Sequence, residues 1–323
     1  MKILVSGCAG FIGTNFMKYS FENHPDDRYI GVDALTYASH PELISEFSKN
    51  KNFIFYKADI CDATAIDAIF KEQKPDIVIN FAAESHVDSS ITDPQLFLRT
   101  NVTGTGVLLD AARKYGVIRF HQVSTDEVYG DTEQSSDYKF REDDILLPSS
   151  PYSASKASAD MLVLSYKKTY GLSVSISRSS NNYGECQHTE KLIPKIVSLA
   201  LRDMPVTVYG DGTNVRNWLY VYDNCEAIDK IARRGKNGEI YNVGSDVYLS
   251  NIKIIKRVLD LLNKPHELIT FTADRPGHDR RYSLSTDKIE RELRWSATAD
   301  FDKKLRETVE FYKNTLSSSL RPK

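Results

Sequence analysis

Several features that would assign a chain to a specialised class are absent from this sequence of 323 residues. It contains no run of about 18 consecutive apolar residues, so we expect no membrane-spanning helix. Residues 1–13 lead directly from a short apolar run into a glycine-rich turn, which leaves no room for a signal peptide. The four cysteines lie far apart, without a Cys-x-x-Cys pair or a neighbouring pair of histidines. This usage gives little support for a metal site and favours reduced thiols in a cytoplasmic protein.

An excess of charge of one sign is also absent. The chain has 42 Lys and Arg residues against 44 Asp and Glu residues, which gives a formal net charge of −2. Proteins that bind nucleic acids usually carry a clear basic excess, so we expect no nucleic-acid partner. With 41% hydrophobic and 27% charged residues, the composition is that of a soluble globular protein, long enough for one large domain or two lobes.

A glycine-rich turn follows the first apolar run, residues 3–6. Its glycines are Gly7, Gly10 and Gly13, and the residues after them are compatible with a helix. In that context the backbone can approach a dinucleotide pyrophosphate closely, and the helix N–H groups face the anion. The second apolar run ends at Asp33, whose carboxylate can accept hydrogen bonds from an adenine ribose and would repel a 2′-phosphate. Together these features predict an NAD site; the alternative is a tight turn and an Asp that caps a helix.

Apolar runs and helical patterns alternate over the first 184 residues. Strands are expected at residues 3–6, 29–32, 53–56, 76–80, 120–124 and 172–178, with helices between them that include residues 94–115 and 152–170. This alternation predicts an α/β fold with a Rossmann-type doubly wound parallel sheet. Ligands bind such sheets at the carboxyl ends of the strands, where Gly7, Asp33, Asp59, Ala82 and Thr125 would meet.

The alternation weakens after Gly184, which predicts a smaller lobe of mixed α/β structure. We expect residues 1–184 to form the NAD-binding Rossmann domain, to which the chain returns near residues 217–246. Residues 185–216 and 247–316 would form a lobe that binds the substrate, and residues 317–323 a disordered tail.

The fifth predicted strand runs into two adjacent acids, Asp126 and Glu127, directly after Thr125. By themselves these acids are best explained as a helix N-terminus, where carboxylates complement the helix dipole. One helical turn separates Tyr152 from Lys156, whose charge can lower the pKa of the phenol and make it a base for a substrate hydroxyl. A Tyr-x-x-x-Lys pair is also common on solvated helices. After a dinucleotide turn, however, it indicates chemistry beside a nicotinamide, with Thr125 aligning the same hydroxyl.

These motifs resemble the extended short-chain dehydrogenase/reductase family and, within it, the nucleotide-sugar 4,6-dehydratases. The resemblance extends in register up to about residue 312 and rests on the runs at residues 7–13, 82–88, 124–130, 149–157, 181–184, 190–194, 209–212, 216–221 and 274–282. Thr125-Asp126-Glu127 is its most specific part, because ordinary epimerases of the family lack the acid pair.

The resemblance implies an NAD-dependent hydro-lyase that acts on a nucleoside-diphosphate hexose. Tyr152, assisted by Lys156 and Thr125, would remove the proton of the 4-hydroxyl as hydride passes from carbon 4 to NAD. Glu127 would then remove the proton on carbon 5, while a protonated Asp126 donates to the departing 6-hydroxyl. Hydride return to carbon 6 and reprotonation of carbon 5 would give a 4-keto-6-deoxy sugar nucleotide, as in deoxysugar or rhamnose-type biosynthesis. Because the net redox change is nil, NAD would stay bound through the cycle.

The resemblance also implies two sets of binding residues. The cofactor set comprises Gly7, Gly10, Phe11, Ile12, Gly13, Asp33, Asp59, Ile60, Ala82, Ala83, Thr100, Tyr152, Lys156 and Asn182. The substrate set comprises Ser85, Asn181, Lys191, Leu192, Thr207, Tyr209, Arg216, Asn251, Asp274, Arg275 and His278. Within it, Arg216 is the expected partner of the diphosphate, because its planar guanidinium matches phosphate oxygens.

The sequence departs from the family pattern at two places near these sites. Cys8 stands where the turn commonly has a glycine, which is tolerable if its side chain points away from the phosphate. Residues 185–189 read Glu-Cys-Gln-His-Thr where the family usually has Pro-Tyr-x-Phe-Pro. Because this segment lies between Asn181 and Lys191 in the sequence, we expect it to influence the choice of sugar or base.

The identity of the substrate and the assembly state therefore stay open. The favoured reaction converts dTDP-glucose to dTDP-4-keto-6-deoxyglucose, with UDP-glucose and UDP-N-acetylglucosamine as alternative substrates. A nucleotide-sugar 4-epimerase, which uses Tyr152 and Lys156 without elimination, is a second alternative, and a non-catalytic NAD-sensing protein is a third. A homodimer is expected through helices at residues 94–115 and 152–170.

Overall fold

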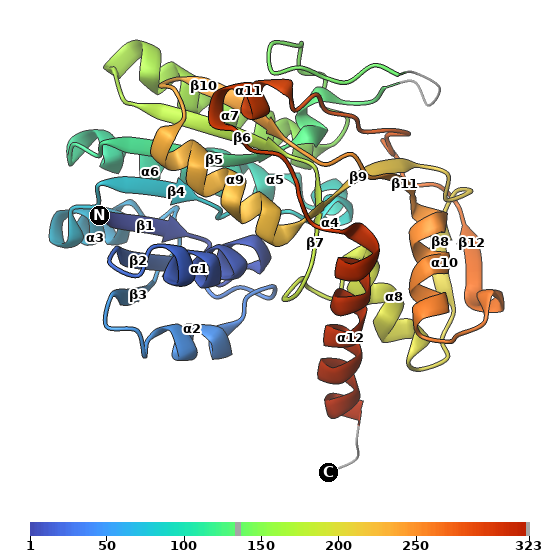
Figure 1. Cartoon of the computed structure of the whole chain (residues 1–323). Coiled ribbons are helices and arrows are strands. Elements are labelled where there is room, and N and C mark those ends of the chain that lie inside the picture. The colour runs from blue at the N-terminus through green and yellow to red at the C-terminus, as the bar shows by residue number, and fades with distance from the viewer. Residues whose placement is uncertain (133–136, 321–323) are drawn as a thin grey trace.

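A parallel sheet of seven strands forms the centre of the structure, a computed structural model that describes residues 1–132 and 137–320. The strands lie in the order β10-β6-β5-β4-β1-β2-β3 (Figure 1). Their bounds are β1 Lys2–Ser6, β2 Arg28–Asp33, β3 Phe53–Lys57, β4 Ile77–Asn80, β5 Arg119–Thr125, β6 Val174–Ser179 and β10 Glu239–Val243. The strand order reverses between β1 and β4, which is where a doubly wound sheet opens a crevice. The predicted Rossmann-type fold is confirmed.

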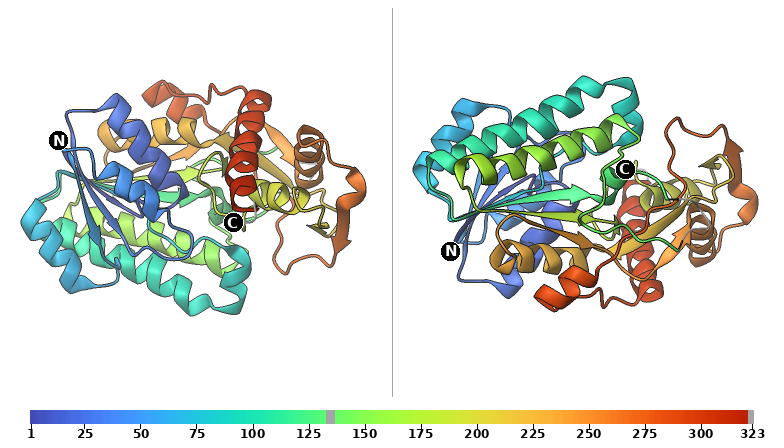
Figure 2. Two further views of the ribbon diagram at one scale, coloured as in Figure 1. Left: turned by 90° about the horizontal axis from the view of Figure 1, so that it is seen from below. Right: turned by 90° about the horizontal axis from the view of Figure 1, so that it is seen from above.

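Alternate residues of each strand enter two separate cores. Ile3 and Val5 of β1 pack on one face, and Leu4 between them packs on the other. The first face is covered by α1 Phe11–Asn23, α2 Pro41–Phe47 and α9 Val221–Arg234, and the second by α3 Ala63–Gln73, α6 Thr105–Lys114 and α7 Pro151–Tyr170. Figure 2 shows these two helical layers with the sheet between them. Burial of both faces explains why these strands read as continuous apolar runs rather than as alternating ones.

The helix predicted at residues 94–115 is divided into three parts. It consists of α5 Pro94–Phe97, a π-helical segment η1 Leu98–Gly104, and α6, and the short helix α4 Val87–Thr92 precedes it. Gly104 ends the π-helical segment, and a Cβ on it would lie 2.5 Å from the side chain of Ile60. The wide turn therefore lies against the loop after β3, at the edge of the crevice. Such turns are frequent at functional sites because they redirect side chains.

The smaller lobe is built from short strands and three helices around a core of its own. A three-stranded sheet has the order β11-β9-β7, and β12 pairs with β8. The bounds are β7 Asn181–Tyr183, β8 Val206–Tyr209, β9 Val215–Tyr220, β11 Tyr248–Ser250 and β12 Ile269–Thr272, with helices α8 Leu192–Ala200, α10 Asn251–Leu261 and α12 Phe301–Leu320 and the short turn η3 His266–Leu268. No helix in the described part of the chain is long and apolar enough to cross a membrane.

Two C-terminal segments differ from the expected division of the chain. Helix α11, Asp287–Leu293, falls in the range assigned from the sequence to the smaller lobe, but Ile289 packs with α9 and β10 beside the large sheet. Helix α12 runs alongside α8 and continues to Leu320, where a disordered tail was expected from residue 317 (Figure 1). Phe301, Leu305, Val309 and Tyr312 of this helix pack into the smaller core, which explains why the helix forms. Residues 321–323 lie outside the described residues.

A buried ion pair joins α7 to β6 beneath the crevice. The guanidinium Nε of Arg178 donates to Asp160 Oδ2 at 3.0 Å, and the two side chains are 1% and 0% exposed. Arg178 also donates to the hydroxyl of Tyr129, which in turn donates to Asn242 on β10. Through Tyr129 and Asn242 the buried pair therefore links α7, β6, β10 and the turn after β5, and removing one partner would leave the other charge uncompensated.

Replacing Asp160 with alanine tests this arrangement. We expect Asp160→Ala to lower the free energy of unfolding by about 3–5 kcal/mol, because Arg178 would stay buried without its counter-ion. Urea unfolding at neutral pH measures the loss. The control is Glu307→Ala, which removes a largely exposed ion pair with Lys304 on α12 and should leave stability close to that of the unsubstituted protein. Equal effects of the two substitutions would contradict the prediction.

Candidate active site

The glycine-rich turn joins β1 to α1 in the way its spacing predicts. Gly7 has a φ of 71°, and a Cβ on it would lie 2.6 Å from the backbone nitrogen of Ala82. A Cβ on Gly13 would overlap the carbonyl oxygen of Gly7. Cys8 is buried and its thiol packs toward Gly31 of β2, so this residue does not occupy the space beside the turn. Close backbone packing is therefore the physical reason for both glycines.

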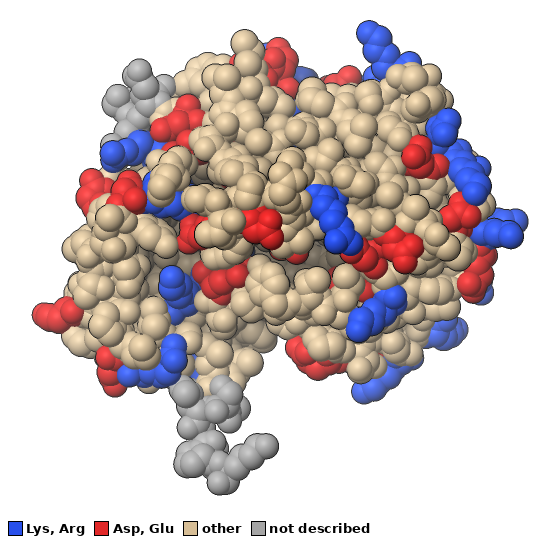
Figure 3. Space-filling model, turned by 180° about the vertical axis from the view of Figure 1, so that it is seen from behind, with Lys and Arg blue, Asp and Glu red and all other residues tan. Residues whose placement is uncertain are grey.

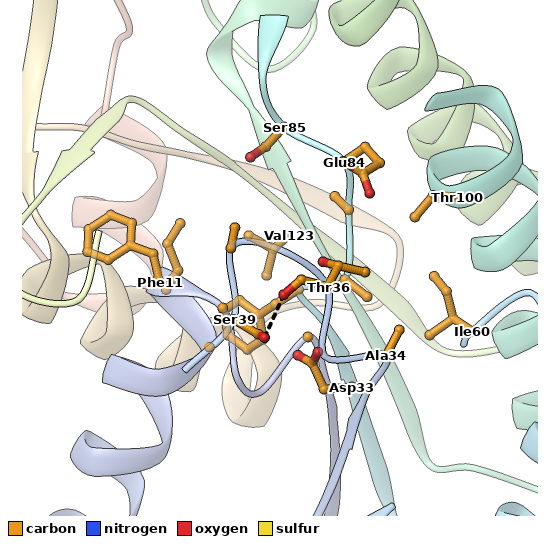
Figure 4. A pocket seen from close by; sticks show the side chains of 18 of the residues that line it. Phe11, Asp33, Ala34, Thr36, Ser39, Ile60, Glu84, Ser85, Thr100 and Val123 are labelled. Atoms are coloured by element: carbon orange, nitrogen blue, oxygen red, sulfur yellow. Dashed lines mark hydrogen bonds between the residues drawn. The ribbon is translucent and has the colours of Figure 1, made fainter. Parts of the chain in front are cut away.

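A cavity of about 320 Å³ opens at the carboxyl ends of the central strands. It collects most of the predicted cofactor residues, as Figure 4 shows for Phe11, Asp33, Ile60 and Thr100. The predicted residues that line it are Gly7, Gly10, Phe11, Ile12, Gly13, Asp33, Asp59, Ile60, Ala82, Ala83, Thr100, Tyr152 and Lys156 from the cofactor set, and Ser85 and Lys191 from the substrate set. Asn182 of the cofactor set is not among the lining residues.

Asp33 lies at the end of β2 and faces the glycine-rich turn. Its two carboxylate oxygens accept hydrogen bonds from the backbone N–H groups of Ala9, at 2.9 Å, and Leu35, at 2.8 Å. Burial raises the pKa of Asp33, and these two hydrogen bonds oppose that effect. The carboxylate is thus held at the cavity wall with lone pairs left to accept further hydrogen bonds from a diol.

Two adjacent acids continue β5 into the short 3-10 turn η2, Asp126–Tyr129. Thr125 caps the turn, because its hydroxyl accepts a hydrogen bond from the N–H of Glu127 at 3.3 Å. Asp126 is buried, and its Oδ2 has no hydrogen-bond partner among the described residues. Burial, followed by the charge of Glu127, raises the pKa of Asp126 to about 8. The acid pair therefore begins a helical turn, as the simpler interpretation proposed. It also places a neutral acid, Asp126, beside the carboxyl group of Glu127.

Tyr152 and Lys156 project from the first turns of α7. The helix begins with a capping box between Ser150 and Ser153. The ammonium of Lys156 donates to the carbonyl of Val123 at 2.7 Å, and burial lowers its pKa to about 8. Burial, followed by the charge of Glu127, raises the pKa of Tyr152. The hydrogen bond with Thr125 opposes this rise in the pKa of the phenol. Acidification of Tyr152 by Lys156 stays a prediction.

Asn101 belongs to this site although sequence reasoning missed it. From the π-helical segment, its Nδ2 donates to the carbonyl of Glu84 at 3.0 Å and to the hydroxyl of Ser155 at 2.8 Å. Ser155 in turn donates to the carbonyl of Tyr152 at 2.7 Å. Asn101 therefore joins the loop after β4 to the helix that carries Tyr152. The signal in the sequence is a polar amide within an otherwise amphipathic helix.

Most of the predicted substrate residues lie on the smaller lobe, outside the dinucleotide cavity. Thr207 and Tyr209 lie on the exposed face of β8, and Asn251 begins α10. None of Leu192, Thr207, Tyr209, Arg216, Asn251, Asp274, Arg275 and His278 is among the residues that line the dinucleotide cavity. The two predicted sets thus lie largely on different lobes. Figure 3 shows acidic and basic side chains interspersed around a hollow on one face of the molecule.

Asp88 bridges the two lobes and was also missed from the sequence. From α4, its carboxylate accepts a hydrogen bond from the hydroxyl of Tyr209 at 3.1 Å and lies 3.3 Å from a guanidinium nitrogen of Arg275. Close by, His278 forms a hydrogen bond of 2.6 Å with Asp274. The smaller lobe therefore contacts the Rossmann domain through these charged and polar side chains, and also through apolar ones, since Leu219 of β9 packs with Tyr241 and Val243 of β10.

Arg216 is buried between the acid pair and the segment at residues 279–282. It donates to the carbonyls of Val215 and Asp279, each at 2.9 Å, and stacks on the ring of Tyr282 at 4.3 Å. Its positive charge opposes the effect of burial on the pKa values of Asp126 and Glu127. The guanidinium is thus positioned by the protein itself and acts electrostatically on the two carboxyl groups.

Several polar atoms near the lobe boundary have unused hydrogen-bonding capacity. The side-chain oxygens of Asn181 and Asn182 on β7 are buried and have no partner among the described residues. Lys191 donates to the carbonyl of Ser85 at 2.8 Å from the start of α8. Buried polar groups without partners are uncommon and mark places where a ligand can complete the bonding.

The segment at residues 185–189 lies beside the dinucleotide cavity and contacts α1. Gln187 and His188 line the dinucleotide cavity, and the carbonyl of Glu185 accepts a hydrogen bond from Asn15 of α1. The segment is therefore in contact with the wall of the crevice that the glycine-rich turn and α1 form. Ser85 and Lys191 of the predicted substrate set line the same cavity. The influence of this segment on the choice of sugar or base stays a prediction.

Comparison with known proteins agrees with this geometry. A family model described as GDP-mannose 4,6 dehydratase matches residues 4–308. The chain is 44% identical to a dTDP-glucose 4,6-dehydratase from Haemophilus influenzae, covering 99% of this chain and 100% of that protein. It resembles the crystal structure of DesIV (dTDP-glucose 4,6-dehydratase) from Streptomyces venezuelae with NAD and TYD bound, with a TM-score of 0.94, 40% identity and 98% coverage of both chains.

A related isomerase shares the fold at lower identity. The structure of UDP-glucose 4-epimerase from Thermotoga maritima has a TM-score of 0.90 and 30% identity, covering 98% of this chain and 100% of that one. The fold alone therefore does not separate dehydratases from epimerases. The family model and the near-full-length relatives show that the chain belongs to the GDP-mannose 4,6-dehydratase family.

Proposed function

We propose that the chain is an NAD-dependent hydro-lyase that converts dTDP-glucose to dTDP-4-keto-6-deoxyglucose, a step of deoxysugar biosynthesis. The observation that carries the proposal is the buried pair of Asp126 and Glu127 at the end of β5, beside Tyr152. A protonated acid next to a second carboxyl group is what an elimination of water requires, and a 4-epimerase has no use for it. The names of the near-full-length relatives support dTDP-glucose as the substrate.

The cavity at the carboxyl ends of β1, β2 and β4 suits NAD. Gly7 and Gly13 place no side chains in the turn, so a pyrophosphate could approach the N-terminus of α1. The carboxylate of Asp33 can accept hydrogen bonds from ribose hydroxyls. A neighbouring structure, DesIV, contains NAD, which supports the same cofactor here. When bound, NAD supplies a hydride acceptor at carbon 4, a hydride donor at carbon 6 and a positively charged ring.

The residues of the chain move the protons of the reaction. Tyr152 accepts the proton of the sugar's 4-hydroxyl, with Thr125 aligning that hydroxyl and Lys156 supplying positive charge. Glu127 accepts the proton from carbon 5, which is acidic once carbon 4 is a ketone. Asp126 donates its proton to the departing 6-hydroxyl, because burial keeps it neutral near pH 7.

The smaller lobe would hold the nucleoside diphosphate. Lys191, Arg216 and Arg275 supply three positive charges at the lobe boundary, and Tyr209 offers an exposed ring on β8. Asn181 has a buried oxygen free to accept a hydrogen bond. These groups fit a diphosphate joined to a base and a sugar.

Dehydration of three sugar nucleotides tests the substrate. The protein is incubated separately with dTDP-glucose, UDP-glucose and UDP-N-acetylglucosamine, and the products are analysed by mass spectrometry. We expect loss of one water from dTDP-glucose and slower or no loss from the other two. If none of the three loses water while one is epimerised, the proposed reaction is wrong.

Replacing Glu127 with glutamine separates oxidation from elimination. We expect Glu127→Gln to slow water loss by about 10²- to 10⁴-fold, because the base for carbon 5 is removed. Reduction of bound NAD should persist, since the charge of Glu127 raises the pKa of Tyr152 and its loss makes that base easier to form. Absorbance of reduced cofactor and product mass report the two steps. Equal loss of both steps would contradict the assignment.

The pH dependence of stability tests the neutral state of Asp126. Between about pH 4 and pH 8 the unfolded chain has lost this proton and the folded chain retains it, so the free energy of unfolding falls as pH rises. The contribution is at most about 1.4 kcal/mol per pH unit. We expect Asp126→Asn to remove it and to slow dehydration, because asparagine neither ionises nor donates a proton. Unfolding curves at several pH values give the free energy of unfolding of both proteins. If this free energy changes with pH equally in Asp126→Asn and in the unsubstituted protein, the prediction is contradicted.

We also propose that the enzyme is a cytoplasmic homodimer. Ile91, Leu96, Leu98 and Met161 are exposed apolar side chains on α4, α5, η1 and α7, and they lie over the helices that the sequence singled out for association. The four cysteines are unpaired, which suits a reducing compartment. Sedimentation analysis would test the assembly.

A further inference from the structure

Two loops far apart in the sequence meet beside the dinucleotide cavity. The first, residues 34–40, follows β2, and the second, residues 184–190, follows β7. Both contribute to the cavity wall, and Figure 4 shows Thr36 and Ser39 of the first loop in place. The residues of the second loop that line the cavity are Gln187, His188 and Glu190.

Side chains of the first loop hold the second. The hydroxyl of Tyr37 donates to Glu190 Oε1 at 3.2 Å, and the ring of Tyr37 packs edge-on against His188, with centroids 5.3 Å apart. The Nε2 of His40 forms a hydrogen bond of 2.8 Å with the carbonyl of Cys186. Polar and aromatic contacts therefore join the loops at two separate points.

Each loop is also attached to the glycine-rich turn or its helix. The N–H of His40 donates to the carbonyl of Ala9 at 2.9 Å, and Asn15 donates to the carbonyl of Glu185 at 2.9 Å. Because the turn and α1 form one wall of the cavity, the two loops and this wall enclose the same space. A ligand seated on the turn would lie beside both loops.

Backbone conformation shows that the two loops are specifically shaped. Leu35 and Cys186 have φ values of 55° and 65°, which are unusual for residues other than glycine. Each is stabilised by a hydrogen bond: the N–H of Leu35 donates to Asp33, and the carbonyl of Cys186 is bonded to His40. Neither loop is therefore an unconstrained surface segment.

We propose that residues 34–40 and 184–190 form a clasp that retains the bound dinucleotide from one turnover to the next. Tyr37, His40 and Glu190 are its retaining residues. The proposal rests on the proposed function for the identity of the dinucleotide. A reaction without net redox change regenerates its cofactor in every cycle, so release of the cofactor serves no step. Apart from Lys191, the predicted substrate residues of the smaller lobe lie outside this cavity, so the sugar nucleotide can exchange while the clasp stays closed.

The rate of NAD release tests the clasp. The holoenzyme, loaded with labelled NAD, is diluted into excess unlabelled NAD, and the retained label is followed by rapid filtration without any sugar nucleotide. We expect Tyr37→Phe and His40→Ala each to release NAD about two- to ten-fold faster, because each removes one hydrogen bond between the loops. The double variant should release it faster than either.

The matched control is Tyr56→Phe. The hydroxyl of Tyr56 also donates to a glutamate, Glu72, but on the β3–α3 side and away from the cavity lining. It should leave the release rate unchanged. Release from Tyr37→Phe, His40→Ala and the double variant at the rate of the unsubstituted protein would overturn the clasp, as would equal acceleration in Tyr56→Phe.

The outcome is separable from that of the proposed function. If dTDP-glucose is not dehydrated but the clasp variants release NAD faster, the substrate assignment fails and the clasp stands. If dehydration proceeds and release rates do not change, the clasp fails and the reaction stands. Glu190→Ala, which removes the acceptor of the Tyr37 hydroxyl, should also speed release, and its failure to do so would count against the clasp.

Discussion

The chemistry of the site depends on the removal of water from the acid pair at the end of β5. A carboxyl group in water is ionised near pH 7 and cannot donate a proton. Asp126 lies at the carboxyl end of a central strand, where helix α7 and the smaller lobe cover it, and its pKa rises to about 8. The charge of Glu127 adds to this effect, so each acid influences the state of the other. In the proposed reaction these two adjacent acids would take opposite roles, one as proton donor and the other as base.

A buried framework below the acid pair keeps it in register with α7. Tyr129, the last residue of the turn that carries both acids, accepts a hydrogen bond from Arg178. Arg178 is paired with Asp160, which lies one helical turn after Lys156 on α7. The turn with the acids and the helix with the phenol are thus fixed to one another through a shared guanidinium. The same buried hydrogen bonds that stabilise the fold therefore also fix the relative positions of the acid pair and Tyr152.

The sequence predicted those parts of the molecule that local chemistry determines. Three patterns depend only on local backbone geometry: the glycine spacing, the position of Asp33 at a strand end, and the alternating apolar runs. The parallel sheet and the cavity at its edge confirm the fold that these patterns predicted. Asn101 and Asp88 could not be found in this way, because their roles depend on partners brought near only by the fold. The segment at residues 185–189 shows the same limit: the sequence places it between Asn181 and Lys191, and only the fold shows that it also contacts α1 through the carbonyl of Glu185.

The charges of the smaller lobe connect substrate binding with proton donation. Arg216 opposes the rise in the pKa of Asp126, and it is held in place by two backbone carbonyls and the ring of Tyr282. A diphosphate bound beside Arg216 would cancel part of its positive charge. The pKa of Asp126 would then rise further, so the acid would hold its proton most firmly when the sugar is in place. If Arg216 binds the diphosphate as proposed, its guanidinium would in this way also keep Asp126 protonated for the proposed elimination.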